Sequence, residues 1–169
     1  MSYWIFIFNQ QPLRQEDTRK VREAVAESNF STLCKQYHLN AKMIHPALEH
    51  LEIVDGEEAF SIFLLLHYHP KNQCPIRVYY WDSQQETGKA LIHDALDEVR
   101  VFGVREKLST ATQVLAVELM ETQLQDMGLL LGYEVARWAA KQGTGIIRGL
   151  DGIWYRLNRH KAFIPMDKK

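Results

Sequence analysis

The chain has 169 residues, of which 46% are hydrophobic and 24% charged, and its formal net charge is −1. A chain of this length and hydrophobicity can bury a core within one domain, which excludes wholesale disorder. The near-neutral charge argues against a protein that coats nucleic acid or an anionic membrane, since both partners need a surplus of lysine and arginine.

Residues 3–8 are aromatic and β-branched, and they lack the basic flank and small-residue cleavage site of a signal peptide. They predict a strand that is apolar on both faces, and therefore one covered on both faces in the centre of a sheet. No run approaches the roughly 18 apolar residues that span a bilayer. The chain has two cysteines, Cys34 and Cys74, which we expect to be reduced thiols in a cytoplasmic protein.

The middle of the chain predicts two helices followed by three strands. The helices are expected over 17–28, where Val21 and Val25 lie four residues apart, and over 31–38. The strands are expected over 48–54, 59–68 and 76–81, with Asp55-Gly56 as a turn. The run 59–68 is the most apolar, and we expect Phe60 to share a face with Ile62, Leu64 and Leu66 in a second central strand.

The last part of the chain alternates helices and strands. A helix is expected over 86–104, a strand over 114–119 and a second helix over 121–142, and a seam between two parts could fall at 109–112. Gly143 and Gly145 are expected to end the second helix. Two short strands follow, over 146–149 and 153–157, with Asp151-Gly152 as the hairpin turn, and the tail from His160 is expected to be irregular.

Because strands and helices do not alternate strictly, the predicted fold is not a regular doubly wound sheet. We expect a single α+β domain over residues 1–169, with a mixed, largely antiparallel sheet, three to four helices and a C-terminal β-hairpin.

Small residues recur every four positions in the helix predicted over 121–142. They are Gly128, Gly132, Ala136 and Ala140. A glycine inside a helix costs about 1 kcal/mol relative to alanine, so two of them need a packing reason. We expect this stripe to lie against another element of the same chain, with a homodimer contact as the alternative.

His67 and His69 are the strongest metal-ligand candidates in the chain, since alternate residues of a strand share a face. His45, His93 and Asp94 are available as third ligands, but no sequence spacing ties them to this pair. A His-x-His pattern alone favours a strand end, and we expect neither a bound metal nor a cofactor.

Cys34 and His38 lie four residues apart on a predicted helix and could form a thiolate–imidazole pair. The neighbouring Leu33 and Tyr37 favour a buried core cysteine instead. The sequence has no nucleophile elbow, phosphate-binding glycine loop, Cys-x-x-Cys or His-Glu-x-x-His motif. These absences weigh against the familiar enzyme classes.

Acidic residues gather on both long predicted helices. A surface of this sign could bind a basic protein partner, although solvated helix faces commonly look the same. The candidate partner-binding residues are Asp94, Asp97, Glu98, Glu121 and Asp126.

The C-terminal third of the chain carries a weak family resemblance. The segments VLAVEL, DMGLLLGYEVARWAAKQG, GIIRG, LDG and IWYRL follow one another between residues 114 and 157. This succession resembles the closing part of small bacterial proteins of unknown function, among them immunity proteins of polymorphic toxin systems. The resemblance covers about a quarter of the chain and contains no catalytic motif.

The resemblance and the missing catalytic motifs together favour a non-enzymatic, protein-binding module with one protein partner and no nucleic-acid or membrane partner. Its most concrete form is a bacterial immunity protein that occludes a cognate toxin. The alternatives are a small metal-dependent enzyme that uses His67 and His69, and a dimeric structural or assembly protein.

Overall fold

The computed structural model describes residues 1–69 and 74–166 and shows an α+β fold built on one eight-stranded sheet. All strand pairs are antiparallel, in the order β2-β3-β4-β5-β1-β6-β7-β8. The strands are β1 (Ser2–Asn9), β2 (Glu52–Asp55), β3 (Ile62–His67), β4 (Ile76–Asp82), β5 (Gln113–Met120), β6 (Ile146–Arg148), β7 (Trp154–Leu157) and β8 (Phe163–Pro165). The predicted α+β class and the C-terminal hairpin are confirmed.

The helices are shorter and more numerous than the sequence predicted. The α-helices of the described residues are α1 (Val21–Ala26), α2 (Phe30–Gln36), α3 (Ile44–Glu49), α4 (Glu86–Glu98), α5 (Phe102–Ser109) and α6 (Met127–Gly143). Short 3₁₀ segments are η1 (Gln15–Lys20), η2 (Ala41–Met43), η3 (Glu58–Phe60) and η4 (Glu121–Gln125).

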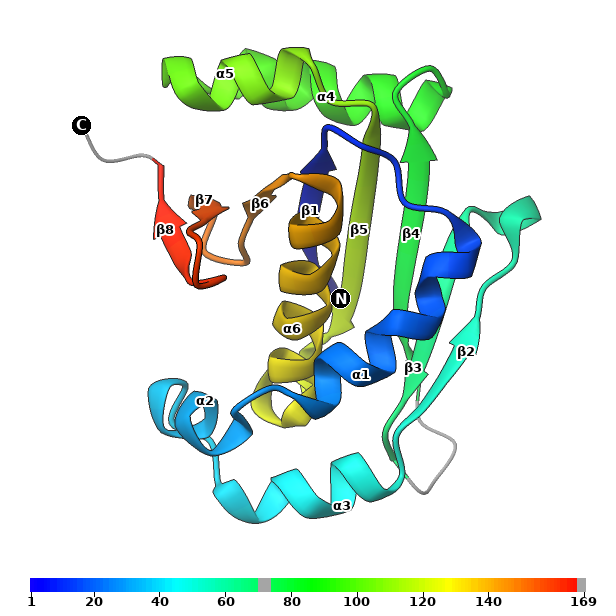
Figure 1. Cartoon of the computed structure of the whole chain (residues 1–169), viewed down its shortest axis with the longest axis vertical. Coiled ribbons are helices and arrows are strands. Elements are labelled where there is room, and N and C mark those ends of the chain that lie inside the picture. Colours follow the sequence, from blue (N-terminus) through cyan, green and yellow to red (C-terminus); the bar gives the residue numbers. More distant parts are fainter. Residues whose placement is uncertain (70–73, 167–169) are drawn as a thin grey trace.

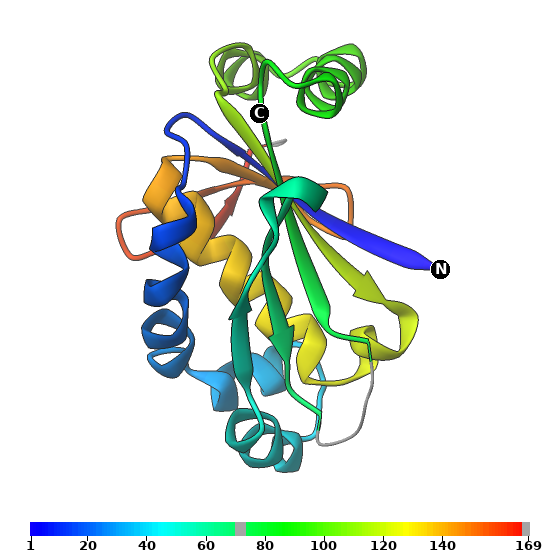
Figure 2. The same ribbon diagram turned by 90° about the vertical axis from the view of Figure 1, so that its right-hand side faces the viewer.

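The helices cover the two faces of the sheet unequally. Helix α6 runs along one face, with α1 beside it and α2 and α3 at the end where α6 begins, whereas α4 and α5 lie across the opposite end of the sheet (Figure 1). Seen from the side, the face opposite α6 carries no helix below α4 and α5 (Figure 2). Two separate hydrophobic clusters follow from this layout: a large one between the sheet and α6, and a smaller one beneath α4 and α5.

The segment 3–8 lies in the middle of the sheet, as predicted, because β1 pairs with β5 on one side and with β6 on the other. Its faces are not equally covered, however. Ile5 and Ile7 are fully buried toward α6, whereas Trp4 and Phe6 on the opposite face are only half-buried. The expectation that both faces are covered is therefore wrong for the first half of β1.

The apolar run 59–68 begins its strand later than predicted. Ser61 adopts the left-handed conformation with φ of 57°, and the register shifts between Ile62 and Leu64. Phe60 consequently lies in η3 with 66% of its surface exposed, not on a strand face with Leu64 and Leu66.

The helix predicted over 86–104 is two helices, because the chain is extended at Val99 and Val101. The Arg105 guanidinium of α5 donates hydrogen bonds to the carbonyls of Leu96 and Val99 at the end of α4. A side chain from the second helix thus satisfies carbonyls that the break leaves without helical partners.

Helix α6 ends differently from the prediction. Thr144, with φ of 52°, is the left-handed residue that closes the helix, and Gly143 and Gly145 serve another purpose. A Cβ at either glycine would lie within 2.3 Å of the buried Asn9 side chain. These glycines therefore let β1 and the end of α6 approach closely.

Two further segments differ from the sequence prediction. Residues 44–49 form α3, so the strand expected from residue 48 starts only at Glu52, and the tail forms β8. Residues 109–112 connect α5 to the middle of the sheet, where the Thr112 N–H donates to the Asn9 carbonyl over 2.8 Å. Cys34 and Cys74 are both free thiols.

Candidate functional site

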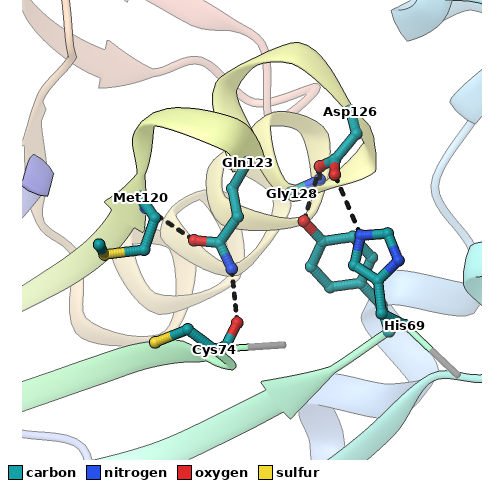
Figure 3. Close-up of polar contacts among 7 residues, drawn as sticks. His69, Cys74, Met120, Gln123, Asp126 and Gly128 are labelled. Atoms are coloured by element: carbon teal, nitrogen blue, oxygen red, sulfur yellow. Dashed lines mark hydrogen bonds and ion pairs between the residues drawn. The ribbon is translucent and has the colours of Figure 1, made fainter. Parts of the chain in front are cut away.

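The two candidate histidines have different surroundings. His67 ends β3 opposite Glu52, while His69 lies beyond the strand end beside Asp126. The His69 Nε2 is 3.1 Å from Asp126 Oδ2, and the Tyr68 hydroxyl donates to Asp126 Oδ1 over 2.6 Å. Figure 3 shows the His69 side chain pointing toward this carboxylate at the start of α6.

Asp126 is also the N-cap of α6, since its Oδ1 accepts the backbone N–H of Gly128 over 2.8 Å. The carboxylate therefore joins the end of β3 to the first turn of α6. Beside it, the Gln123 amide accepts from the Met120 N–H and donates to the Cys74 carbonyl, which joins η4 to the start of β4 (Figure 3). The sequence identified His69 and Asp126 separately but did not predict that they meet.

The contacts of Tyr68, His69 and Asp126 indicate a structural role for this cluster. Burial, together with the hydrogen bond to Asp126, raises the pKa of Tyr68 far above its usual range, so its hydroxyl stays protonated and donating. The Cys74 sulfur points away from His69 in Figure 3, so no thiol–imidazole pair forms there. The cavity beside these residues has a volume of about 10 Å³, room for about one water molecule.

No group of three His, Cys, Asp or Glu side chains within residues 1–69 and 74–166 is placed to hold a metal ion. We therefore expect the purified protein to bind less than 0.1 equivalent of zinc. Elemental analysis of purified protein checks this. About one zinc per chain, lost in a His67→Ala/His69→Ala variant, would contradict the prediction.

The five candidate acids do not come together. Asp94 and Asp97 flank His93 on α4, at 3.9 and 3.3 Å from its Nδ1, and Glu98 pairs with Arg148 over 3.0 Å. Glu121 and Asp126 follow β5, whereas α4 lies at the end where β5 begins. The eight residues of β5 separate the two groups by roughly 25 Å.

Cys34 and His38 do not form a reactive pair. Cys34 is 1% exposed in the core, and burial raises the pKa of its thiol. His38 is exposed beyond the end of α2, with φ of 57°. The interpretation of Cys34 as a core residue is confirmed.

The most distinctive surface is the part of the sheet that no helix covers. We call it the open face and define it by Trp4 and Phe6 of β1, Arg77, Tyr79 and Trp81 of β4, and Ala116 and Glu118 of β5. The strand register aligns them in rows, because Glu118 lies between Trp4 and Arg77, and Ala116 lies between Phe6 and Tyr79. All of them except the fully buried Ala116 are half-buried.

The aromatic rings of the open face form a continuous group. Tyr79 and Trp81 stack with centroids 5.7 Å apart and an interplanar angle of 2°, and Trp4 stacks on Phe6 at 6.2 Å. The rings of Trp4 and Tyr79 meet at 5.9 Å from strands on either side of β5. The small Ala116 side chain beneath them leaves room for this contact.

The charged groups of the open face neutralise one another. Glu118 accepts from Ser2 Oγ over 2.7 Å and from the Tyr79 hydroxyl over 3.3 Å, and it pairs with Arg77 over 3.5 Å. Burial and the Glu118 charge raise the pKa of Tyr79, so its hydroxyl remains a donor. The open face thus presents aromatic groups around a satisfied polar centre.

Helix α4 closes one end of the open face. A Cβ at Gly88 would lie 3.4 Å from the Trp81 Cβ, and Glu98 pairs with Arg148, which lies opposite Phe6. The helix therefore crosses from β4 to β6 over the four strands β4, β5, β1 and β6. Beneath it, Phe8, Val114 and Trp154 are buried, and the exposure of the aromatic rings begins where this cover ends.

Comparisons with known proteins add no further information, since no family model, curated protein or solved structure matches this chain. Among the described residues, no helix combines the length and hydropathy needed to cross a bilayer.

Proposed function

We propose that the protein is a non-enzymatic, protein-binding module and that the open face is its binding surface. The proposal is carried by four half-buried aromatic side chains, Trp4, Phe6, Tyr79 and Trp81, on the part of the sheet face that α4 leaves uncovered. Tryptophan and tyrosine are enriched at the energetic centres of protein interfaces, where they bury a large apolar area and still offer a polar edge.

The charges of the open face favour a protein partner over a nucleic acid. Single-stranded nucleic acid needs aromatic platforms and also free cations for its phosphates. Arg77 of the open face is paired with Glu118, and Arg148, which lies next to the open face opposite Phe6, is paired with Glu98, so neither cation is free. A partner with apolar side chains and a few hydrogen-bonding groups fits this surface better.

A bacterial immunity protein remains the most concrete form of the proposal, and it rests on the resemblance of the C-terminal third. In that form the open face would bind a cognate toxin and occlude it. The acids Asp94 and Asp97 of α4 lie near one end of the open face, and Glu121 follows β5 at the other, so they could contact the edge of the toxin. Asp126 is left out of this surface, because three donors already occupy its carboxylate.

We expect a Trp4→Ala/Tyr79→Ala variant to bind its partner at least 100-fold more weakly than wild type, since two interface aromatics commonly contribute about 2 kcal/mol or more each. The partner is captured from the host cell, identified and purified, and its dissociation constant is measured with both proteins. Phe102→Ala is the matched control, because Phe102 is 78% exposed on α5, away from the open face.

Three outcomes would contradict the proposal. One is unchanged affinity in a double variant whose circular dichroism shows the native fold. Another is a wild-type homodimer that this variant abolishes, because the open face would then bind a second copy. The third is turnover in a general substrate screen with no protein partner recovered.

A further inference from the structure

A cavity of about 320 Å³ lies on the side of the sheet opposite the open face. Its walls are α6, the connection between α1 and α2, and the turn near His160. Helix α6 contributes Glu134, Arg137, Trp138 and Lys141, whose spacing of three and four residues places them on one side of the helix. Segments more than 100 residues apart in the chain therefore form one site, which the sequence alone did not reveal.

The floor of this cavity holds a fixed cation. Glu134 is 8% exposed; its carboxylate accepts from Ser28 Oγ over 2.8 Å and pairs with Arg137 over 3.2 Å. The Arg137 guanidinium also donates to the Lys161 carbonyl over 2.6 Å and lies 4.6 Å from the centre of the Phe163 ring. These contacts hold the guanidinium in one position before any ligand arrives.

The charge of the cavity lining leaves room for an anion. The Arg137 Nε has no hydrogen-bond partner among the described residues, but it is shielded from solvent and therefore does not face the cavity. Lys141 and Lys161 line the same cavity, and neither is ion-paired within the described part of the chain. Three cations, Arg137, Lys141 and Lys161, stand against two carboxylates, Glu134 and the exposed Glu27, so the formal charge of the lining is +1 with His160 counted as neutral.

The remaining lining is apolar enough to hold the body of a small molecule. Leu33, Ala24 and Trp138 line the cavity, and Trp138 is held against the Phe63 ring at 6.3 Å. Ligand sites commonly combine such apolar walls with a few converging polar groups. We propose that this cavity binds a small organic anion, a carboxylate or a phosphate ester, with its charge toward Arg137, Lys141 and Lys161 and its apolar body toward Trp138.

The test uses nuclear magnetic resonance of the ¹⁵N-labelled full chain with phenyl phosphate and benzoate as probes. We expect at least one probe to shift the Arg137 Nε–H and Trp138 indole signals saturably, with a dissociation constant of about 1 mM or tighter. A Lys141→Glu/Lys161→Glu variant should bind that probe at least tenfold more weakly. Lys89→Glu, on the distant helix α4, is the matched control and should bind like wild type.

Phenol and inorganic phosphate separate the two halves of the proposal. If phenol binds as tightly as phenyl phosphate, the cations contribute nothing to the affinity. If inorganic phosphate binds as tightly as phenyl phosphate, the apolar wall contributes nothing. Either result overturns the proposal, as does the absence of shifts at Arg137 and Trp138 with both probes, or equal affinity in the lysine variant. None of these outcomes bears on the open face.

Discussion

Replacing Gly132 with leucine should lower the melting temperature by roughly 6–12 °C, which corresponds to about 3 kcal/mol for a chain of this size. A Cβ at Gly132 would already lie 3.2 Å from both Cδ atoms of Leu119 and 3.5 Å from the Val117 side chain. The remaining three carbons of leucine would have to enter the fully buried contact between α6 and β5, so helix and strand would be forced apart. Thermal unfolding followed by circular dichroism measures the change.

Gly132→Ala is the matched control. Its single methyl group meets flexible side-chain ends and gains up to about 1 kcal/mol of helix propensity, so its melting temperature should stay within about 4 °C of wild type. If Gly132→Leu melts within a degree or two of wild type, the stripe of small residues does not form a tight contact and the packing described here is wrong.

Replacing Asp126 with alanine should destabilise the protein by about 2–4 kcal/mol. The change removes the N-cap of α6, which contributes about 1 kcal/mol, and it leaves the hydroxyl of Tyr68 without its acceptor. Tyr68 is only 4% exposed, and an unsatisfied buried group costs about 1–3 kcal/mol. Urea denaturation measures the free energy of unfolding.

Two further variants separate the cap from the tyrosine. Asp126→Asn keeps an oxygen that can accept from Gly128 and from Tyr68, so it should cost less than about 1 kcal/mol. In a Tyr68→Phe background, Asp126→Ala should cost at least 1 kcal/mol less than in wild type, because no hydroxyl is left stranded. Additive effects of the two substitutions would show that their hydrogen bond contributes nothing to stability.

The parts of the fold that were predicted correctly are those with a strong local pattern. Residues 3–8, 76–81 and 114–119 are strands, and Gly152, with φ of 78°, turns the C-terminal hairpin as expected. The errors arise where distant contacts decide the structure. The predicted helix ends at Glu98, although neither glycine nor proline stands there. The Arg105 side chain of α5 hydrogen-bonds a carbonyl at this helix end, a contact that hydrophobic periodicity does not reveal.

The candidate surface was only partly predictable, for the same reason. Alternation along residues 2–8 places Trp4 and Phe6 on one face of β1, and this was visible in the sequence. How much of this face stays uncovered depends on where α4 crosses the sheet. Helix α4 is held there by the Glu98–Arg148 pair and by its contact with Trp81. The Glu98–Arg148 pair joins residues 50 positions apart and leaves no periodic signal.

The central position of β1 has a consequence for how the protein is made. Asn9 pairs with Gln113, which lies 104 residues later in the chain. The other edge of β1 pairs with β6, which begins at Ile146. At about 5–20 residues per second, a ribosome would take roughly 5–20 s to supply β5. During that interval one of the most aromatic segments of the chain has neither of its neighbouring strands. Synthesis thus creates a period in which the nascent chain is prone to aggregate, so chaperone supply should affect the yield of soluble protein.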